Sequence, residues 1–224
     1  MTVTYQVLNL SQGGGSNNLL INPRGKINQA NENDGVLSAG QYFCDGWKAG
    51  GSGAEVYRDS DGFRLISGSI VQLVPNNLDV GRQIRGNMDI ISGTPIIRIN
   101  GGGDDELSNT QPYITFEIIG DNSKFTRLIL SESVELPVYQ QSLDELVSCE
   151  KYLKIISSLH VDVAASEYYW LGFDNMIKVP AISIIGGTLG ANSIMRGFGV
   201  NYMTMTVNND SVHWCEKLII DARP

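Results

Sequence analysis

The chain of 224 residues contains 25 glycines and only 18% charged residues, a composition typical of a β-rich protein with many turns. Its formal net charge of −8 at pH 7 argues against general nucleic-acid binding and against docking onto anionic lipid, since both need clustered Lys and Arg. No run approaches the roughly 20 apolar residues that a membrane span requires. Residues 1–10 lack the basic start and the apolar core of a signal peptide. We therefore expect the chain to be made in a reducing cytoplasm and not to insert into a membrane.

The N-terminal region, residues 1–17, is predicted to form a short strand and a flexible joint. Residues 1–10 alternate in polarity, and residues 11–18 (SQGGGSNN) are rich in Gly, Ser and Asn. An apolar strand that enters the core is expected at Leu19–Ile21. Further along, Trp47 is predicted to be buried, with one hydrogen-bond partner for its indole N–H.

Residues 18–140 are predicted to form an antiparallel, jelly-roll-like β-sandwich, because short β-type segments follow one another without an intervening helix. The turn residues Asp61-Gly62 predict a tight hairpin. Tyr113–Ile119 and Phe125–Leu130 are expected to face each other across the turn at residues 120–123. The other predicted strands are Val56–Arg58, Phe63–Ser67, Ser69–Val74, Asn87–Ile91 and Ile96–Asn100.

A helix that links two β-regions is predicted over residues 141–158. Its apolar stripe consists of residues at helical spacing, namely Leu146, Cys149, Leu153 and Ile156. Ser142 and Glu145 have the spacing of a capping box, which satisfies free backbone N–H groups of the first turn. Glu150 and Lys154 stand four residues apart, in the order that favours an ion pair on a helix.

Residues 159–224 are predicted to form a smaller C-terminal β-domain, with loops rich in Gly, Asn and Ser. The expected strands are Tyr168–Phe173, Ala181–Gly186, Met203–Asn208 and Glu216–Asp221. No internal repeat indicates a solenoid or a propeller. The chain is thus expected to be mainly β, with one linking α-helix.

The predicted helix carries a pattern that resembles phage tail-fibre and receptor-binding proteins. The residues of this pattern are Pro137, Ser142, Glu145, Leu146, Cys149, Lys151 and Tyr152. Residues 18–29 (NLLINPRGKINQ) and 42–47 (YFCDGW) resemble the opening and an internal element of the sandwich in the same family. Residues 179–184 (VPAISI) and 214–223 (WCEKLIIDAR) occupy the places of its tail portion, although the ending departs from the family's acidic form.

This resemblance implies a non-enzymatic virion protein, a tail-fibre or receptor-binding subunit made in the bacterial host cytoplasm. It implies a homotrimer that contacts other virion proteins and attaches to a bacterial surface glycan. Leu146, Leu153 and Ile156 are expected near the subunit contact or at the junction of the two β-domains. Two alternatives stay open: a structural decoration or connector protein without a receptor site, and a glycan depolymerase.

No catalytic residue, cofactor or metal site is predicted. His213 and Cys215 lie two residues apart and are more simply half-buried strand residues than a base and its thiol nucleophile, and His160 is the other histidine. The three cysteines, Cys44, Cys149 and Cys215, lack a CxxC spacing, so neither a disulfide framework nor a zinc site is expected. Loop carboxylates could serve a glycosidase, but their neighbours favour turn formation. These carboxylates are Asp45, Glu55, Asp59, Asp61, Asp104, Asp105 and Glu106.

The glycan site is predicted in the C-terminal domain, because in the resembling family the chain runs from particle to cell. Tyr168, Tyr169 and Trp170 form the densest aromatic cluster, and at least one ring should face outward because strand residues alternate faces. Aromatic rings also pack in cores and at subunit interfaces, so both roles stay open as alternatives for this cluster. The Gly-rich loop 186–196 adds exposed donors and acceptors. The predicted ligand-binding residues are Tyr168, Tyr169, Trp170, Asn192, Arg196, His213 and Trp214.

Overall fold

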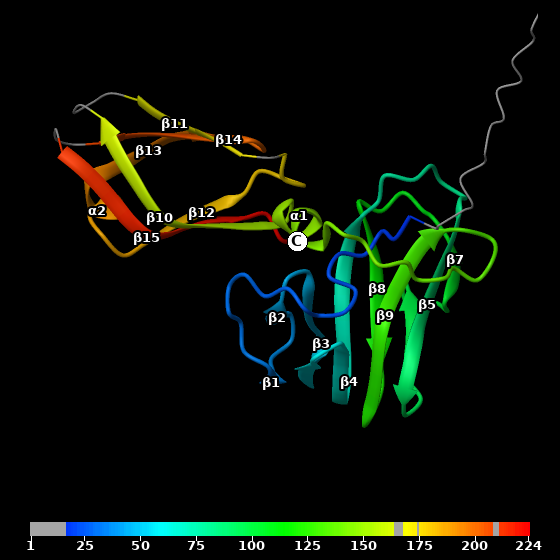
Figure 1. The fold of residues 1–224 in the computed structure, drawn as a ribbon. Helices are drawn as coiled ribbons and strands as arrows, with labels where there is room; N and C mark the ends of the chain where they lie inside the picture. Colours follow the sequence, from blue (N-terminus) through cyan, green and yellow to red (C-terminus); the bar gives the residue numbers. More distant parts are fainter. Residues whose placement is uncertain (1–16, 164–167, 174, 208–210) are drawn as a thin grey trace, which may run out of the picture.

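The structure, a computed structural model, describes residues 17–163, 168–173, 175–207 and 211–224. Two β-regions stand on either side of a short helix, α1 (Glu145–Glu150), as Figure 1 shows. The mainly β prediction, with antiparallel sheets and a helix between two β-regions, is confirmed. The predicted N-terminal strand and joint, residues 1–16, lie outside the described residues. None of the described helices is long and apolar enough to cross a membrane.

In the sandwich, nine strands of the described chain form one network of antiparallel pairs. They are β1 (Gly35–Leu37), β2 (Tyr42–Cys44), β3 (Trp47–Asp59), β4 (Gly62–Pro75), β5 (Gln83–Ser92), β6 (Ile96–Ile99), β7 (Asp105–Leu107), β8 (Tyr113–Ile119) and β9 (Ser123–Glu132). The path runs β1-β3-β4-β9-β5-β7, with β2 paired to β3 and β8 connecting β4 to β6. The predicted hairpin at Asp61-Gly62 is confirmed, since Asp59 pairs with Gly62 where β3 turns into β4.

The long strand β4 divides its pairing between two layers of the sandwich. Its first part, Phe63–Leu65, pairs with β9, and its second part, Ser69–Pro75, pairs with β8. Gly68 stands at the change of partner with φ +85°, and a Cβ there would collide with the carbonyl oxygen of Gly53. β8 and β9, the strands predicted to face each other across the turn at residues 120–123, do not pair with each other among the described residues. They pair with different parts of β4 and bury side chains in the same core.

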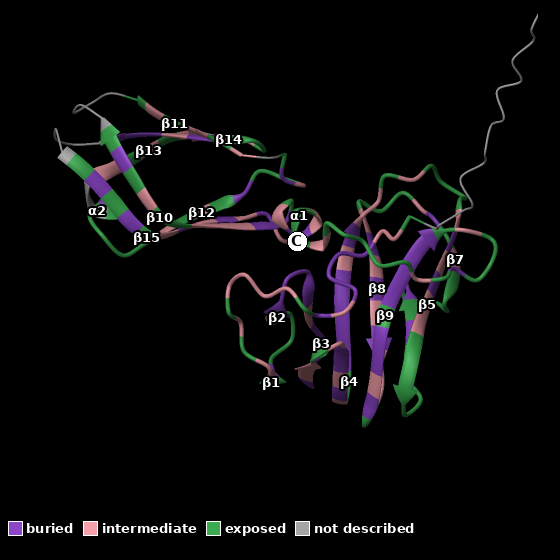
Figure 2. Cartoon of the chain, in the orientation of Figure 1, coloured by how far each residue is buried: buried purple, intermediate pink, exposed green. Residues whose placement is uncertain are grey.

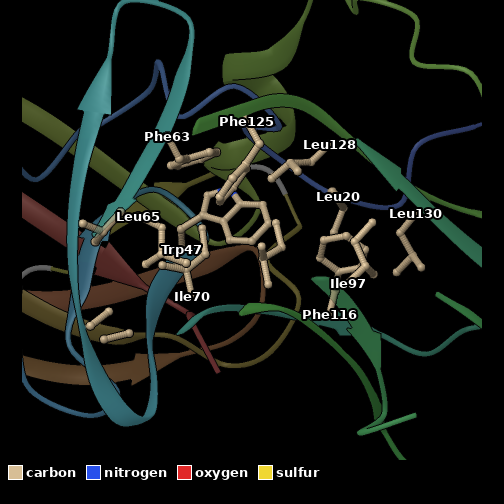
Figure 3. Close-up of a cluster of buried hydrophobic side chains, with 14 of the residues drawn as sticks. Leu20, Trp47, Phe63, Leu65, Ile70, Ile97, Phe116, Phe125, Leu128 and Leu130 are labelled. Carbon is tan, nitrogen blue, oxygen red and sulfur yellow. The ribbon is translucent and has the colours of Figure 1, made fainter. Parts of the chain in front are cut away.

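Trp47 lies in the core of the sandwich, where it is fully buried (Figure 3). Its ring centroid lies 5.3 Å from that of Phe63 and 6.2 Å from that of Phe116. The indole Nε1 donates to the carbonyl oxygen of Asn22 at 2.9 Å, so the predicted burial and hydrogen-bond partner are confirmed. Figure 2 shows the neighbouring strands β4 and β9 as mostly buried around this core.

The segment Leu19–Ile21 packs against the core but does not form the predicted strand. Leu20 and Ile21 are buried, as an apolar segment entering the core requires. The N–H of Leu19 donates to the carbonyl of Leu130 on β9 at 2.8 Å, but the next two backbone N–H groups donate to side chains. Leu20 donates to Asn18 Oδ1 at 3.1 Å, and Ile21 donates to Gln72 Oε1 at 2.8 Å. These side chains therefore replace the sheet ladder at this point.

The predicted helix over residues 141–158 is wrong in its extent, because α1 ends at Glu150 and the strand β10 (Leu153–Val163) follows. The capping box does not form. The Ser142 hydroxyl accepts a hydrogen bond from the backbone N–H of Asp144, and the Glu145 carboxylate forms an ion pair with Arg24 at 3.1 Å. Segment length and side-chain pairing at the start of α1 thus both differ from the prediction.

The helix-like spacing of Leu153 and Ile156 has another origin, a change of buried face along β10. Leu153 is buried beside the sandwich, where its carbonyl accepts from Gln29 Nε2 at 2.7 Å, whereas Ile156 packs against the core of the C-terminal unit. Leu159 and Val161, at odd-numbered positions, also face that core. The change from even-numbered to odd-numbered core positions occurs at Ser158, whose φ is +57°. Leu146, the third predicted interface residue, is half exposed on α1.

The C-terminal unit consists of two three-stranded antiparallel sheets in the described residues. One has the order β10-β15-β12 and the other the order β11-β14-β13. The remaining elements are β11 (Tyr168–Gly172), β12 (Ala181–Ile185), the single turn α2 (Leu189–Asn192), β13 (Ser193–Phe198), β14 (Tyr202–Val207) and β15 (Ser211–Asp221). Apolar side chains from both sheets form one core between them. Sequence reasoning placed strands near β11, β12, β14 and β15, but it took β13 for a loop and β10 for a helix.

The end of the described chain returns to the sandwich and ties the two β-regions together. Arg223 forms ion pairs with Glu32 of the sandwich at 2.6 Å and with Asp221 at 2.9 Å. Its guanidinium carbon lies 4.2 Å from the ring centroid of Tyr42. The hydroxyl of Tyr42 donates to the carbonyl oxygen of Pro224 at 2.7 Å. Burial raises the pKa of Tyr42 to about 12, so this hydroxyl remains a donor at neutral pH.

Candidate functional site

The sheet β11-β14-β13 presents one face to its own core and the other face outward. On the inner face, Tyr169, Met203 and Met205 pack in the core of the C-terminal unit. Because strand residues alternate faces, the intervening residues point outward. The outer residues are Tyr168, Trp170, Ile194, Tyr202, Thr204 and Thr206, together with Arg196. We call this surface the aromatic face.

Cross-strand pairing arranges the aromatic face in rows. Tyr168, Thr206 and Ile194 occupy one row across β11, β14 and β13. Trp170 and Thr204 occupy the next, which continues to Gly197. Tyr168 and Trp170 are 71% and 64% exposed as residues, so the prediction that at least one of the three clustered aromatics faces outward is confirmed for two of them. Both are held by a paired strand rather than by a loop.

Glycines allow two rings of the aromatic face to lie against the backbone. A Cβ on Gly172 would lie 2.7 Å from Cη2 of Trp170, so the indole extends over that glycine. A Cβ on Gly199 would lie 2.5 Å from Cε1 of Tyr202, so the second ring covers another glycine. A ring that lies along a sheet exposes a flat face, which can stack against a flat partner.

Replacing Gly172 by alanine is expected to displace the indole of Trp170 without unfolding the chain. The added methyl group meets only the far edge of a side chain, so the free energy of unfolding should change by less than about 1 kcal/mol. The indole N–H resonance of Trp170 should shift in a ¹H–¹⁵N spectrum. Gly51→Ala is the matched control, because nothing lies within 4 Å of its added Cβ. An unchanged Trp170 resonance in Gly172→Ala would contradict this packing.

Arg196 reaches the aromatic face because β13 carries a bulge there. The register shifts between Met195 and Gly197, and the extra residue places Arg196 beside Thr206. The Nε of Arg196 donates to Thr206 Oγ1 at 3.0 Å. The Thr204 hydroxyl donates to the carbonyl oxygen of Gly197 at 3.2 Å. The aromatic face thus combines three exposed aromatic residues, Tyr168, Trp170 and Tyr202, with the threonine Thr204 and the cation of Arg196.

Three of the seven predicted ligand-binding residues, Tyr168, Trp170 and Arg196, lie together on this face. Tyr169 points into the core, where burial raises the pKa of its hydroxyl. His213 is buried on β15, and Trp214 is exposed on the outer side of the other sheet, next to Thr188. The backbone of Asn192 ends α2, while its side chain lies outside the described part of the chain.

Sequence reasoning missed the contributions of Tyr202, Thr204 and Thr206 to the aromatic face. The run Tyr202–Thr206 (YMTMT) alternates strictly between methionine, which is buried, and residues that face outward. That alternation is a readable strand signal, and it identifies the outer threonines once Met203 and Met205 are assigned to the core. The pairing partner of each threonine could not be read from it.

Cys215 and His213, the candidate nucleophile and base on β15, are both buried. Burial raises the pKa of the Cys215 thiol, which disfavours the thiolate needed for attack. Burial likewise raises the pKa of Cys149, whose predicted core position is confirmed. Asp45 is buried and accepts two hydrogen bonds from Gln29, and Asp61 pairs with Lys26 at 3.1 Å. Within the described residues, no group of three or more His, Cys, Asp or Glu side chains is placed to hold a metal ion.

A groove of about 280 Å³ runs between the start of the sandwich and the segment before α1. Its lining is polar, but much of it maintains the fold. Asn18 Nδ2 donates to the carbonyl of Leu128 at 2.8 Å, and the Tyr139 hydroxyl donates to Glu145 at 3.1 Å. The aromatic face offers larger exposed groups for a ligand, and it is therefore the stronger candidate.

Comparisons of the chain with protein-family models, with curated proteins and with solved structures found no match. Function therefore has to be inferred from the chemistry of the aromatic face and from the patterns in the sequence.

Proposed function

We propose that the chain is a non-enzymatic phage virion protein, a tail-fibre or receptor-binding subunit, and that it binds a bacterial surface glycan through the aromatic face. The observation that carries the proposal is the exposure of Tyr168 and Trp170 side by side on one paired strand. The resemblance of the sequence patterns supplies the virion context.

The chemistry of the aromatic face suits a sugar better than it suits an apolar partner. A pyranose has C–H groups on its flat side, which stack on aromatic rings, and hydroxyl groups at its edge, which need hydrogen-bond partners. Trp170 offers the stacking surface, and the hydroxyl of Thr204 and the guanidinium of Arg196 lie on the neighbouring strands. Tyr and Trp give large contact areas at low cost in side-chain entropy, because each has only two rotatable side-chain bonds.

A homotrimer is part of this proposal, because three copies of one weak site raise the overall affinity by avidity. Exposed apolar residues of and beside α1 support a contact between copies: Leu143 is 97% exposed, and Leu146 and Val147 are each about half exposed. Light scattering of the purified chain should give three times the monomer mass. A purely structural connector would form the same trimer and would bind no glycan.

Trp170→Ala is expected to lower the affinity for a bacterial surface glycan at least tenfold. An interface aromatic commonly contributes about 2 kcal/mol or more, and 1.4 kcal/mol corresponds to a factor of ten. The glycan is first identified with an array of surface polysaccharides and the purified chain, and affinities are then measured by titration calorimetry.

Trp214→Ala is the matched control, since Trp214 is also an exposed tryptophan beside a glycine but lies on the outer side of the other sheet. It should bind like the parent chain. Equal loss in both variants would remove the aromatic face as the site, and the absence of any bound glycan would favour the structural connector. Release of reducing sugar by the parent chain would contradict the non-enzymatic assignment.

A further inference from the structure

Arg196 adds a property to the aromatic face that stacking on a neutral sugar does not require. Its side chain is exposed, and its Nε is fixed by the Thr206 hydroxyl at 3.0 Å. Thr206 itself is only 4% exposed, because it lies between cross-strand neighbours on both sides. The hydroxyl is therefore occupied in orienting a cation instead of facing solvent.

The orientation leaves most of the guanidinium available to a ligand. An arginine side chain has five N–H donors in a planar fork, and the hydrogen bond to Thr206 uses one of them. In the part of the chain that the structure describes, Arg196 takes part in no ion pair and stacks on no aromatic ring. Other arginines do both: Arg223 pairs with Glu32 and lies over Tyr42.

The position of Arg196 matches the size of a substituted sugar ring. Tyr168 and Arg196 lie on the two outer strands of the sheet, with Thr206 between them on β14. Two inter-strand spacings amount to about 10 Å. A sugar ring stacked on Tyr168 or Trp170 can therefore reach the guanidinium of Arg196 with one acidic substituent.

The net charge of −8 opposes binding of an anionic polymer by the chain as a whole, so an anionic group needs a cation at the point of contact. Among the described residues of the aromatic face, Arg196 supplies that cation. A guanidinium binds carboxylate and phosphate groups through two parallel hydrogen bonds and is more weakly hydrated than an ammonium group.

We infer that the ligand of the aromatic face is an anionic glycan, whose sugar ring stacks on Trp170 or Tyr168 while its carboxylate or phosphate group binds Arg196. This inference rests on the proposed glycan-binding function and specifies its ligand class. Carboxylate and phosphate are the shared chemistry of uronate-containing polysaccharides and of polyol-phosphate polymers.

The test measures the full chain by titration calorimetry against two matched pairs of probes. One pair is a uronate-containing oligosaccharide and its carboxyl-reduced form, and the other is a polyol-phosphate polymer carrying sugars and its dephosphorylated fragments. The parent chain should bind one acidic probe about tenfold more tightly than its neutral partner. Arg196→Gln should abolish that preference and leave the affinity for the neutral probe unchanged. Arg196→Lys should restore part of it, since lysine keeps the charge without the fork.

Arg127→Gln is the charge-matched control, because Arg127 is an exposed arginine of the sandwich that pairs with Asp89 at 3.1 Å. It should keep the full preference for the acidic probe. Equal affinity of the parent chain for acidic and neutral probes would overturn the anionic ligand while leaving the glycan site in place. Binding that Trp170→Ala does not weaken would overturn the proposed function itself, and a preference retained by Arg196→Gln would remove Arg196 from the site.

Discussion

Replacing Trp47 by alanine is expected to lower the free energy of unfolding by about 3–5 kcal/mol, the usual cost of deleting a large buried aromatic side chain. Trp47 is fully buried and packs against Phe63 and Phe116 in the sandwich core. The truncation leaves a cavity and also leaves the carbonyl of Asn22 without its indole donor. Urea unfolding followed by circular dichroism measures the change.

Two further variants separate packing from hydrogen bonding at Trp47. Trp47→Phe keeps an aromatic ring but removes the indole donor, so it should cost about 1–3 kcal/mol, less than alanine does. Val36→Ala, at an exposed position of β1, should change the free energy of unfolding by less than about 0.5 kcal/mol. A loss below about 1 kcal/mol in Trp47→Ala would contradict its central place in the core.

Arg223→Ala is expected to destabilise the junction of the two β-regions by about 3–5 kcal/mol, because removing one partner of a buried ion pair leaves the other charge buried alone. The side chains of Arg223 and Glu32 are only 11% and 17% exposed. The variant also loses the contact with Tyr42. Calorimetry should resolve two unfolding transitions where the parent chain gives one, since the sandwich and the C-terminal unit have separate cores.

The control for Arg223→Ala is Arg127→Ala, which breaks an exposed pair with Asp89 and should cost at most about 1 kcal/mol. The pH dependence of Arg223→Ala follows from the surroundings of Glu32. Burial raises the pKa of Glu32 above 4.5, and Arg223 opposes that rise. Without Arg223 the pKa rises further, so the folded variant takes up a proton more readily than the unfolded chain as the pH falls. The loss of unfolding free energy in Arg223→Ala should therefore be largest at pH 7 and shrink on acidification towards the pKa of Glu32. A loss that grew on acidification would contradict the buried Arg223–Glu32 ion pair.

Local sequence signals predicted those features of the fold that depend on local chemistry. The Asp61-Gly62 turn fixes a hairpin through backbone preferences of its own residues, and Trp47 is buried because few environments suit a ring of that size. The outward position of Tyr168 and Trp170 follows from strand alternation alone. None of these required knowledge of which strands are neighbours.

Features that depend on distant partners could not be predicted in this way. The pairing of β8 and β9 with different parts of β4 depends on Gly68, whose φ of +85° no periodicity reveals. The face change at Ser158 gave β10 a spacing typical of a helix. At the candidate site, the bulge in β13 decides that Arg196 lies beside Thr206, and a single extra residue in a strand leaves no mark on composition.

The backbone enters and leaves the C-terminal unit at one point, where the N–H of Ala222 donates to the carbonyl of Tyr152 at 2.8 Å (Figure 1). Residues 153–221 are thus a closed excursion whose ends are fastened to each other, with Arg223 just beyond them on the sandwich. Such an excursion can be exchanged as a cassette between related chains if the graft keeps the two neighbouring splice points, the Arg223 contact and the contacts of Ile177, whose N–H donates to the carbonyl of Lys151 at 3.0 Å and whose side chain packs against Cys149 and Tyr152. Diversification of the surface that carries Trp170 can therefore proceed by recombination at Tyr152 and Ala222 without altering the sandwich core.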